Sequence, residues 1–273
     1  MNTLYIADLQ NNRVQKWLYK AQNGTTVAGQ SNCLPGSNAS YLKEPGGVHL
    51  DSNDNLYVAD RKNFRVQLWQ KNAISGKTVV GTGIAGSAND QLQDAYHVIY
   101  DESSDTLYVS DYDGHRVMSY KSGILMGTVV AGNNGAGFNT NQLKQPMRFV
   151  LDSITNSLII ANYAAHNVIR WTLGASNWQL IAGSMNGTAT TLNGPIGVTL
   201  DPMGNIYVAD TINARIQKFS IGDNLGTTIC GIQGSPGWNS SQLNSPYSVR
   251  FDNQLNIYVA DTVNHRIQKF SRY

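Results

Sequence analysis

The chain has 273 residues, of which only 14% are charged, and its 20 basic residues exceed its 18 acidic ones by two. Long surface helices are not expected, because Glu, Lys and Arg, which favour helices and form ion pairs along them, are scarce. The small net charge argues against a strongly basic nucleic-acid-binding protein, and no apolar run approaches the roughly 18 residues that cross a bilayer. We therefore expect no membrane partner. Residues 1–8 show no signal-peptide pattern, and the cellular compartment stays open.

One 14-residue segment occurs six times without gaps. In each copy a hydrophobic run ends in Asp or Asn, and a second run follows after a short polar tip. The copies start at Leu4, Leu56, Leu107, Leu158, Ile206 and Ile257, at intervals of 48 to 52 residues. A fixed period of this size is the signature of a repeat architecture.

Two further runs complete each unit. A Pro-x-x-Val-x-Leu-Asp pattern precedes five copies, at residues 45–51, 95–101, 146–152, 195–201 and 246–252, with Ala for Pro in the second. A Thr-Val-Val-Ala-Gly pattern follows the first five copies, at residues 25–29, 78–82, 128–132, 179–183 and 227–231. Each unit of about 50 residues thus predicts four short strands joined by turns, as in a propeller blade. We refer to them as the first to fourth strands of a unit.

The expected fold is therefore an all-β, six-bladed β-propeller of four-stranded antiparallel blades, forming a single domain over residues 1–273. The first blade lacks its first strand and the last blade lacks its fourth, which leaves 22 strands. We expect the two incomplete blades to expose edges that could pair with another copy of the chain.

The Leu-Tyr-Val-Ala-Asp run, with the Asn-His-Arg-Val-Gln-Lys-Trp/Phe hairpin that follows it, resembles the NHL repeat, which is named for an Asn-His-Leu signature. The signature His occurs at His115, His166 and His265 and is replaced elsewhere by Asn12, Phe64 and Ala214. The resemblance implies a six-bladed propeller. It also implies two binding roles known in the family: substrate recognition in ubiquitin ligases of the tripartite-motif type, and single-stranded RNA binding.

An Asp ends the second strand and an Arg opens the third, five residues later, in every unit except the fourth. There Asn162 and Asn167 replace both residues together. The joint loss of both charges indicates that they pair across the hairpin, since one charge left alone in a partly buried turn is costly. We predict structural ion pairs at Asp8/Arg13, Asp60/Arg65, Asp111/Arg116, Asp210/Arg215 and Asp261/Arg266.

Residues that differ between units are the better candidates for function. In a propeller the loops entering the first strands and the tips between second and third strands share one face. We call this the loop face. An aromatic and mildly basic rim is expected there, as is typical of interfaces. Its candidate binding residues are Tyr96, His97, Tyr112, His115, Met147, Arg148, Tyr163, His166 and Tyr247.

The predicted function is a non-catalytic binding or scaffold propeller that recognises a protein partner, within a larger ubiquitin-ligase-like protein whose ligase activity lies outside this chain. Single-stranded RNA binding is the alternative, and a metal-dependent propeller lyase or hydrolase is a second one. We expect no catalytic residue, metal site or cofactor, because His97 alone occupies a strand entry where such lyases place several zinc-binding His. Ordinary surface variation between repeats would explain the rim equally simply.

Overall fold

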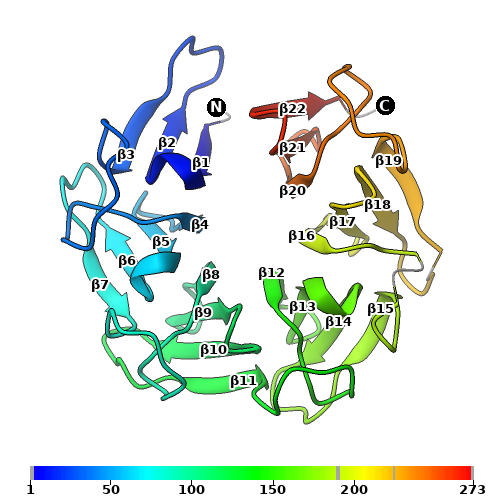
Figure 1. The fold of residues 1–273 in the computed structure, drawn as a ribbon, viewed down its shortest axis with the longest axis horizontal. Helices are drawn as coiled ribbons and strands as arrows, with labels where there is room; N and C mark the ends of the chain where they lie inside the picture. The colour runs from blue at the N-terminus through cyan, green and yellow to red at the C-terminus, as the bar shows by residue number, and fades with distance from the viewer. Residues whose placement is uncertain (1–2, 189–190, 224, 272–273) are drawn as a thin grey trace. The chain divides into compact units, whose positions relative to one another are not determined.

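The structure is a computed structural model that describes residues 3–188, 191–223 and 225–271. In these residues 22 strands form six antiparallel sheets, four with four strands and two with three, and there is no α-helix. The fold is an all-β, six-bladed propeller (Figure 1). The chain divides into two compact units, Met1–Val130 and Ala131–Tyr273, which we call unit 1 and unit 2 and describe separately.

Unit 1 contains the first three sheets. The first has three strands, β1 (Leu4–Asp8), β2 (Arg13–Trp17) and β3 (Thr25–Gly29). The second contains β4 (Pro45–Leu50), β5 (Leu56–Asp60), β6 (Arg65–Trp69) and β7 (Lys77–Val80). The third contains β8 (Ala95–Asp101), β9 (Thr106–Asp111), β10 (Arg116–Lys121) and β11 (Thr128–Gly132), and the division between the units falls within β11.

Unit 2 contains the other three sheets. Strands β12 (Pro146–Asp152), β13 (Ser157–Asn162), β14 (Asn167–Thr172) and β15 (Gln179–Gly183) form the first of them. The next contains β16 (Pro195–Leu200), β17 (Ile206–Asp210), β18 (Arg215–Phe219) and β19 (Thr227–Gly231). The last has three strands, β20 (Pro246–Phe251), β21 (Ile257–Asp261) and β22 (Arg266–Phe270).

The observed sheets confirm the predicted fold class. Strands follow chain order across every sheet, and the two three-stranded sheets occur where the repeat pattern lacks a run. The single-domain boundaries and the pairing of sheet edges with another copy stay predictions.

Local sequence explains where the strands turn. The Asp that ends a first strand accepts hydrogen bonds from the turn that follows, as when Asp51 Oδ1 accepts the N–H groups of Asn53 and Asn55 at 3.0 and 2.8 Å. At the tip between second and third strands, the residue before the Arg adopts a left-handed conformation, with φ between 51° and 55° in all six repeats. That residue is Asn, Phe, His or Ala, although Gly and Asn suit this conformation best.

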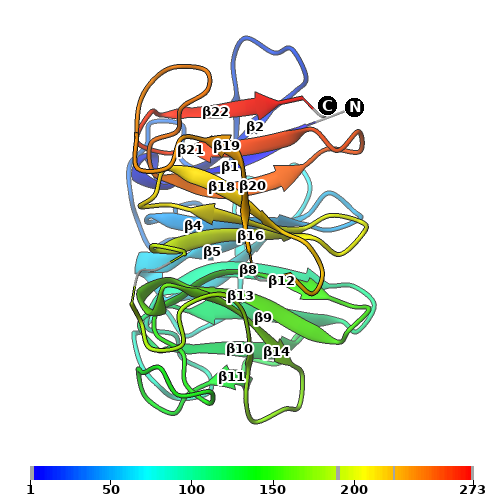
Figure 2. The ribbon, with the colours of Figure 1, turned by 90° about the vertical axis from the view of Figure 1, so that its right-hand side faces the viewer.

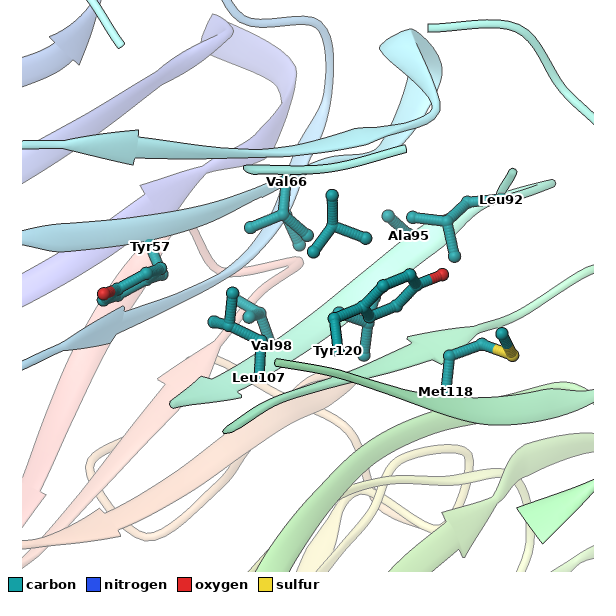
Figure 3. Packing of buried hydrophobic residues seen from close by; sticks show 11 residues of the cluster. Tyr57, Val66, Leu92, Ala95, Val98, Leu107, Met118 and Tyr120 are labelled. Carbon is teal, nitrogen blue, oxygen red and sulfur yellow. The ribbon is translucent and has the colours of Figure 1, made fainter. Parts of the chain in front are cut away.

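Apolar side chains from neighbouring sheets pack together between them. In unit 1 the second and third sheets bury Tyr57, Val66, Val98, Leu107 and Tyr120 in one cluster (Figure 3). Each fully buried side chain of this size contributes about 1.5–3 kcal/mol to stability. The aromatic residue at or next to the end of the third strand is buried in the four complete sheets, at Trp69, Tyr120, Trp171 and Phe219.

The loop face of unit 2 is formed where loops entering the first strands meet the tips between second and third strands. Backbone hydrogen bonds join them in each sheet: Tyr163 N–H to Gln145 O, Ile212 N–H to Asn193 O and Val263 N–H to Asn244 O. Figure 2 shows the loop before β20 (orange) and the β21–β22 tip at the same end of the strands.

Candidate functional site

The five Asp and Arg pairs anticipated from the sequence are ion pairs in the structure. The Arg Nε to Asp Oδ2 distance is 3.0 Å for Asp8/Arg13, 2.8 Å for Asp60/Arg65, 2.9 Å for Asp111/Arg116, 2.8 Å for Asp210/Arg215 and 2.7 Å for Asp261/Arg266. Burial is deepest at Asp111 and Arg116, whose side chains are 0% and 1% exposed. A buried pair of this kind is costly to break, because the partner that remains keeps an uncompensated charge.

In the four sheets that have both an ion pair and an entering loop, the pair also fastens that loop. The second oxygen of the Asp accepts a backbone N–H from that loop, as with Lys43 N–H to Asp60 Oδ1 at 2.7 Å and Asn193 N–H to Asp210 Oδ1 at 2.7 Å. The Arg donates to the same loop: Arg116 reaches the carbonyl oxygens of Ser87, Ala88 and Gln91. We call this arrangement the loop clamp. It holds the loop face in place.

The fourth sheet builds the clamp from two neutral amides. Asn162 Oδ1 accepts Lys144 N–H at 2.7 Å, and Asn162 Nδ2 donates to Asn167 Oδ1 at 3.1 Å. Asn167 Nδ2 in turn donates to the loop carbonyl of Ser184 at 2.6 Å. The joint replacement therefore keeps the hydrogen bond across the hairpin and the contact of Asn162 to the entering loop, while Asn167 donates to the loop after β15 and both charges are removed.

In unit 1 the loop face carries a cationic and aromatic cluster. Arg61 holds the buried carboxylate of Asp94 with two hydrogen bonds of 2.8 Å, and Lys62 Nζ lies 3.1 Å from the same carboxylate. The guanidinium of Arg61 also lies 4.7 Å from the centre of the Tyr96 ring, which is 5.9 Å from the Tyr112 ring. Asp94 was not predicted from the sequence as a partner of Arg61 and Lys62. The sequence does place this acid immediately before a first strand, and it places the two basic residues at a tip of the preceding repeat.

The candidate rim residues of unit 1 differ in accessibility. Tyr96 and His97 are 3% and 1% exposed, so their side chains support the rim from inside. Tyr112 and His115 are half-buried, and His115 is the left-handed residue of its tip, with φ 52°.

In unit 2, Met147 is buried, whereas Arg148, Tyr163, His166 and Tyr247 are partly exposed. Tyr163 and His166 converge on one glycine. Gly194 N–H donates to His166 Nδ1 at 3.0 Å, and a Cβ added at Gly194 would lie 2.9 Å from Tyr163 and 2.8 Å from Ile212. The structure therefore brings Tyr163, His166 and Ile212 together around Gly194.

The hydrogen bond from Gly194 sets the chemistry of His166. Because Nδ1 accepts a hydrogen bond, the neutral ring carries its own proton on Nε2. Burial lowers the pKa of His166, and the charge of Lys144 lowers it further, against a smaller opposing effect of Asp210. His166 is thus a neutral hydrogen-bond donor at physiological pH.

A group of exposed apolar side chains adjoins Gly194, and we call it the Trp238 patch. It consists of Ile212, Ile232, Trp238 and Val263, and Trp238 is 65% exposed. The loop before β20 connects them: it carries Ile232 and Trp238, its Gly234 N–H donates to Asn213 O beside Ile212, and its Asn244 O accepts Val263 N–H. Arg266 Nη1 donates to Trp238 O at 2.7 Å, which ties the loop to its clamp.

The Trp238 patch was not predicted from the sequence. Counting back eight residues from the first residue of each first strand gives Ser37, Ser87, Phe138, Gly187 and Trp238. Comparing the five entering loops at this position would have identified the two large aromatic residues in unit 2. Phe138 lies against Gly187, since a Cβ there would be 2.1 Å from its ring, and Lys144 Nζ lies 4.4 Å from the ring centre.

Among the described residues, no three His, Cys, Asp or Glu side chains gather in a way that could hold a metal ion. The same part of the chain contains no helix long and apolar enough to cross a membrane.

Comparison with known proteins agrees with this architecture. The sheets and clamped hairpins define a β-propeller of the repeat-protein class. The model of the NHL repeat matches residues 42–68, 192–219 and 243–270, each ending at or beside the end of a third strand. The protein is therefore a β-propeller in which three of the six repeats match the NHL repeat.

One curated relative is the chloroplastic protein SUPPRESSOR OF QUENCHING 1 of Arabidopsis thaliana, which is 23% identical over 262 residues. The match covers 83% of this chain and 25% of that protein, so the chain spans a quarter of its relative's length.

Two solved structures show the same fold at low identity. An auxiliary nutrient binding protein from Bacteroides ovatus superposes with a TM-score of 0.72 at 15% identity, over 98% of this chain and 65% of that one. A catalytically inactive virginiamycin B lyase from Staphylococcus aureus, solved with quinupristin, has a TM-score of 0.62 at 12% identity, over 99% of this chain and 87% of that one. These similarities concern the fold alone.

Proposed function

We propose that the protein is a non-catalytic binding module that recognises a protein partner through the loop face of unit 2. The observation that carries this proposal is the Trp238 patch, in which one loop joins a 65% exposed Trp to the exposed Ile212, Ile232 and Val263. Clustered apolar side chains of this kind, unlike scattered ones, mark interaction sites on soluble proteins. Trp is also among the residues that most often dominate binding energy.

The surroundings of the patch suit an interface. Tyr163 and His166 adjoin it through Gly194, and the amide and guanidinium groups of Asn264 and Arg266 lie beneath its loop. An apolar centre with a polar rim is the usual anatomy of a protein interface. The loop clamps hold the patch in a set conformation, which lowers the entropic cost of binding.

The remaining rim candidates, Tyr112, His115, Arg148 and Tyr247, belong to this proposal as surrounding contacts. So does a place for the module as the substrate-recognition part of a larger, ubiquitin-ligase-like protein. That role rests on the family resemblance, because the patch itself indicates only that a protein partner binds.

A photo-crosslinking amino acid at Ile232 tests the proposal in cells that express the protein. We expect a small set of crosslinked proteins that disappears when Trp238→Ala is added. The matched control places the same crosslinker at Ile154, which is 92% exposed in the β12–β13 turn, at the opposite end of the strands. Crosslinks that survive Trp238→Ala, or that are the same from Ile154, would contradict the proposal.

The dependence of binding on salt concentration distinguishes RNA binding from the binding of a protein partner. A single-stranded RNA pool that binds the purified protein at about 50 mM salt, and is released steeply as salt rises, would favour the RNA alternative. Under the protein-partner proposal we expect no such binding, and we expect the crosslinked species to be resistant to ribonuclease.

A further inference from the structure

The first strands of the three sheets in unit 2 carry two arginines with an unusual environment. β12, β16 and β20 follow one another, with β16 in contact with both of the others. Arg148 lies on β12 and Arg250 on β20, so that β16 lies between the strands that carry them. At the equivalent position to Arg148, β16 has Gly197 and β20 has Ser248.

The side chain of Arg250 extends over the open edge of β16. β16 pairs with β17 on one side only, and Arg250 Nη1 donates to its Val198 carbonyl oxygen at 2.9 Å and to Val249 O at 3.3 Å. The backbones are close here, since a Cβ added at Gly197 would lie 2.8 Å from Ser248 Cα. The guanidinium is therefore held at a defined place while two of its nitrogens, Nε and Nη2, donate to no acceptor among the described residues.

The charge of Arg250 lacks an acidic partner. Across the described part of the chain, no carboxylate lies within ion-pair distance of it, and the nearest acid in sequence, Asp252, accepts hydrogen bonds from its own turn at Gln254 and Asn256. Burial, together with a smaller effect of the positive charge of Arg148, lowers the pKa of Arg250 to about 10. The side chain of Arg250 is nevertheless exposed to solvent, so a small molecule can reach it.

Ser248 adds a neutral donor. It lies two residues from Arg250 on β20, and side chains two residues apart in a strand point to the same side. Its hydroxyl has no hydrogen-bond partner among the described residues and is partly exposed. The Arg250 guanidinium and the Ser248 hydroxyl thus lie on the same side of β20, and the positive charge of Arg148 on β12 is near enough to act on Arg250.

We propose that Arg148, Ser248 and Arg250 bind the oxyanion group, a carboxylate or a phosphate, of a small ligand at the open edge of β16. An Arg offers parallel N–H donors that match both kinds of oxyanion. A bound anion would offset the repulsion that the charge of Arg148 exerts on Arg250. This site is separate from the Trp238 patch and does not depend on the function proposed for that patch.

The test titrates the purified protein with inorganic phosphate, and separately with succinate, at constant ionic strength. Binding is followed by calorimetry and by the Nε resonance of Arg250. We expect saturable binding of at least one probe, weakened tenfold or more by Arg250→Gln and by Arg148→Gln. Arg170→Gln is the control. Arg170 lies on β14, in the same sheet as β12, and it is paired with Asp152. Preference for phosphate or for succinate identifies the oxyanion.

Stability separates a ligand site from a structural brace. If Arg250 serves a ligand, Arg250→Gln relieves the repulsion with Arg148, and we expect its unfolding midpoint without ligand to equal or exceed that of the wild type. A lower midpoint, the absence of binding up to about 10 mM of either probe, or undiminished binding by Arg250→Gln would each overturn the proposal. Trp238→Ala should leave anion binding unchanged, so the two proposals fail independently.

Discussion

Asn162 Nδ2 donates a hydrogen bond of 3.1 Å to Asn167 Oδ1, across the hairpin where the other five sheets hold an Asp and Arg ion pair. The neutral pair keeps the contact to the entering loop through Lys144 N–H. The loop clamp thus requires an acceptor for the loop and a matched partner across the hairpin, and it does not require charge. In none of the six hairpins is one residue of the pair charged while its partner is neutral.

Replacing the buried pair Asp111/Arg116 with two asparagines tests this requirement. Asp111→Asn and Arg116→Asn alone should each lower the unfolding free energy by about 3–5 kcal/mol, because a buried charge loses its partner. The double variant should lose clearly less than the sum of the two. Urea unfolding of all four proteins measures the coupling, and simple additivity would show that the two side chains act independently.

Loss of a clamp carboxylate should matter far more than loss of an exposed one. Asp210→Ala leaves Arg215 without its carboxylate and removes the acceptor for Asn193 N–H, so we expect a clearly lower unfolding midpoint. Asp54→Ala is the control, since its pair with Lys71 is exposed on both sides and such pairs add little to stability. Equal midpoints for the two variants would contradict the structural role of the clamp.

Arg61 and Lys62 share Asp94 unequally. Arg61→Ala removes both 2.8 Å hydrogen bonds from a carboxylate that is 1% exposed, whereas Lys62→Ala removes one contact from a side chain that is 36% exposed. We expect Arg61→Ala to destabilise the protein by about 3 kcal/mol or more and Lys62→Ala by under about 1 kcal/mol. Thermal unfolding would refute this if the order were reversed.

His166 should make stability depend on pH. Its pKa is lowered in the folded protein, so the unfolded chain binds a proton near pH 6.5 that the folded protein takes up only at lower pH. The stability that His166 confers is therefore complete above about pH 6.5 and is lost as pH falls below it. The unfolding free energy of the wild type should drop more than that of His166→Asn between pH 8 and pH 5. His265→Asn, at the equivalent left-handed position, serves as the control, and parallel curves for wild type and His166→Asn would contradict the assignment.

The fold was predictable because its signals are local and repeated. A strand that ends in Asp, a tip with a left-handed residue and an Arg five residues later recur at nearly constant spacing, so each repeat predicts its own strands and the period predicts the number of blades. The two three-stranded sheets followed from the same count.

The surface was less predictable because accessibility depends on neighbouring sheets. Tyr96 and His97 begin a first strand in the same way as the partly exposed Tyr247 and Ser248, yet they are buried, with Arg61 stacked on Tyr96. The position of Arg250 over β16 likewise depends on how two first strands approach at Gly197. Such contacts join residues that lie in different repeats, and no local pattern in one strand specifies them.

Strands β18 and β22 have the same five residues, Arg-Ile-Gln-Lys-Phe, but β18 lies between two strands whereas β22 pairs with β21 alone among the described residues. Four of the five residues are buried in β18 and none in β22. The two strands therefore have identical side chains and differ in the number of strands that flank them. Amide hydrogens of β22 should exchange with deuterium faster than their counterparts in β18, and the ratio of the rates, residue by residue, would measure how strongly one covering strand protects a propeller blade from opening.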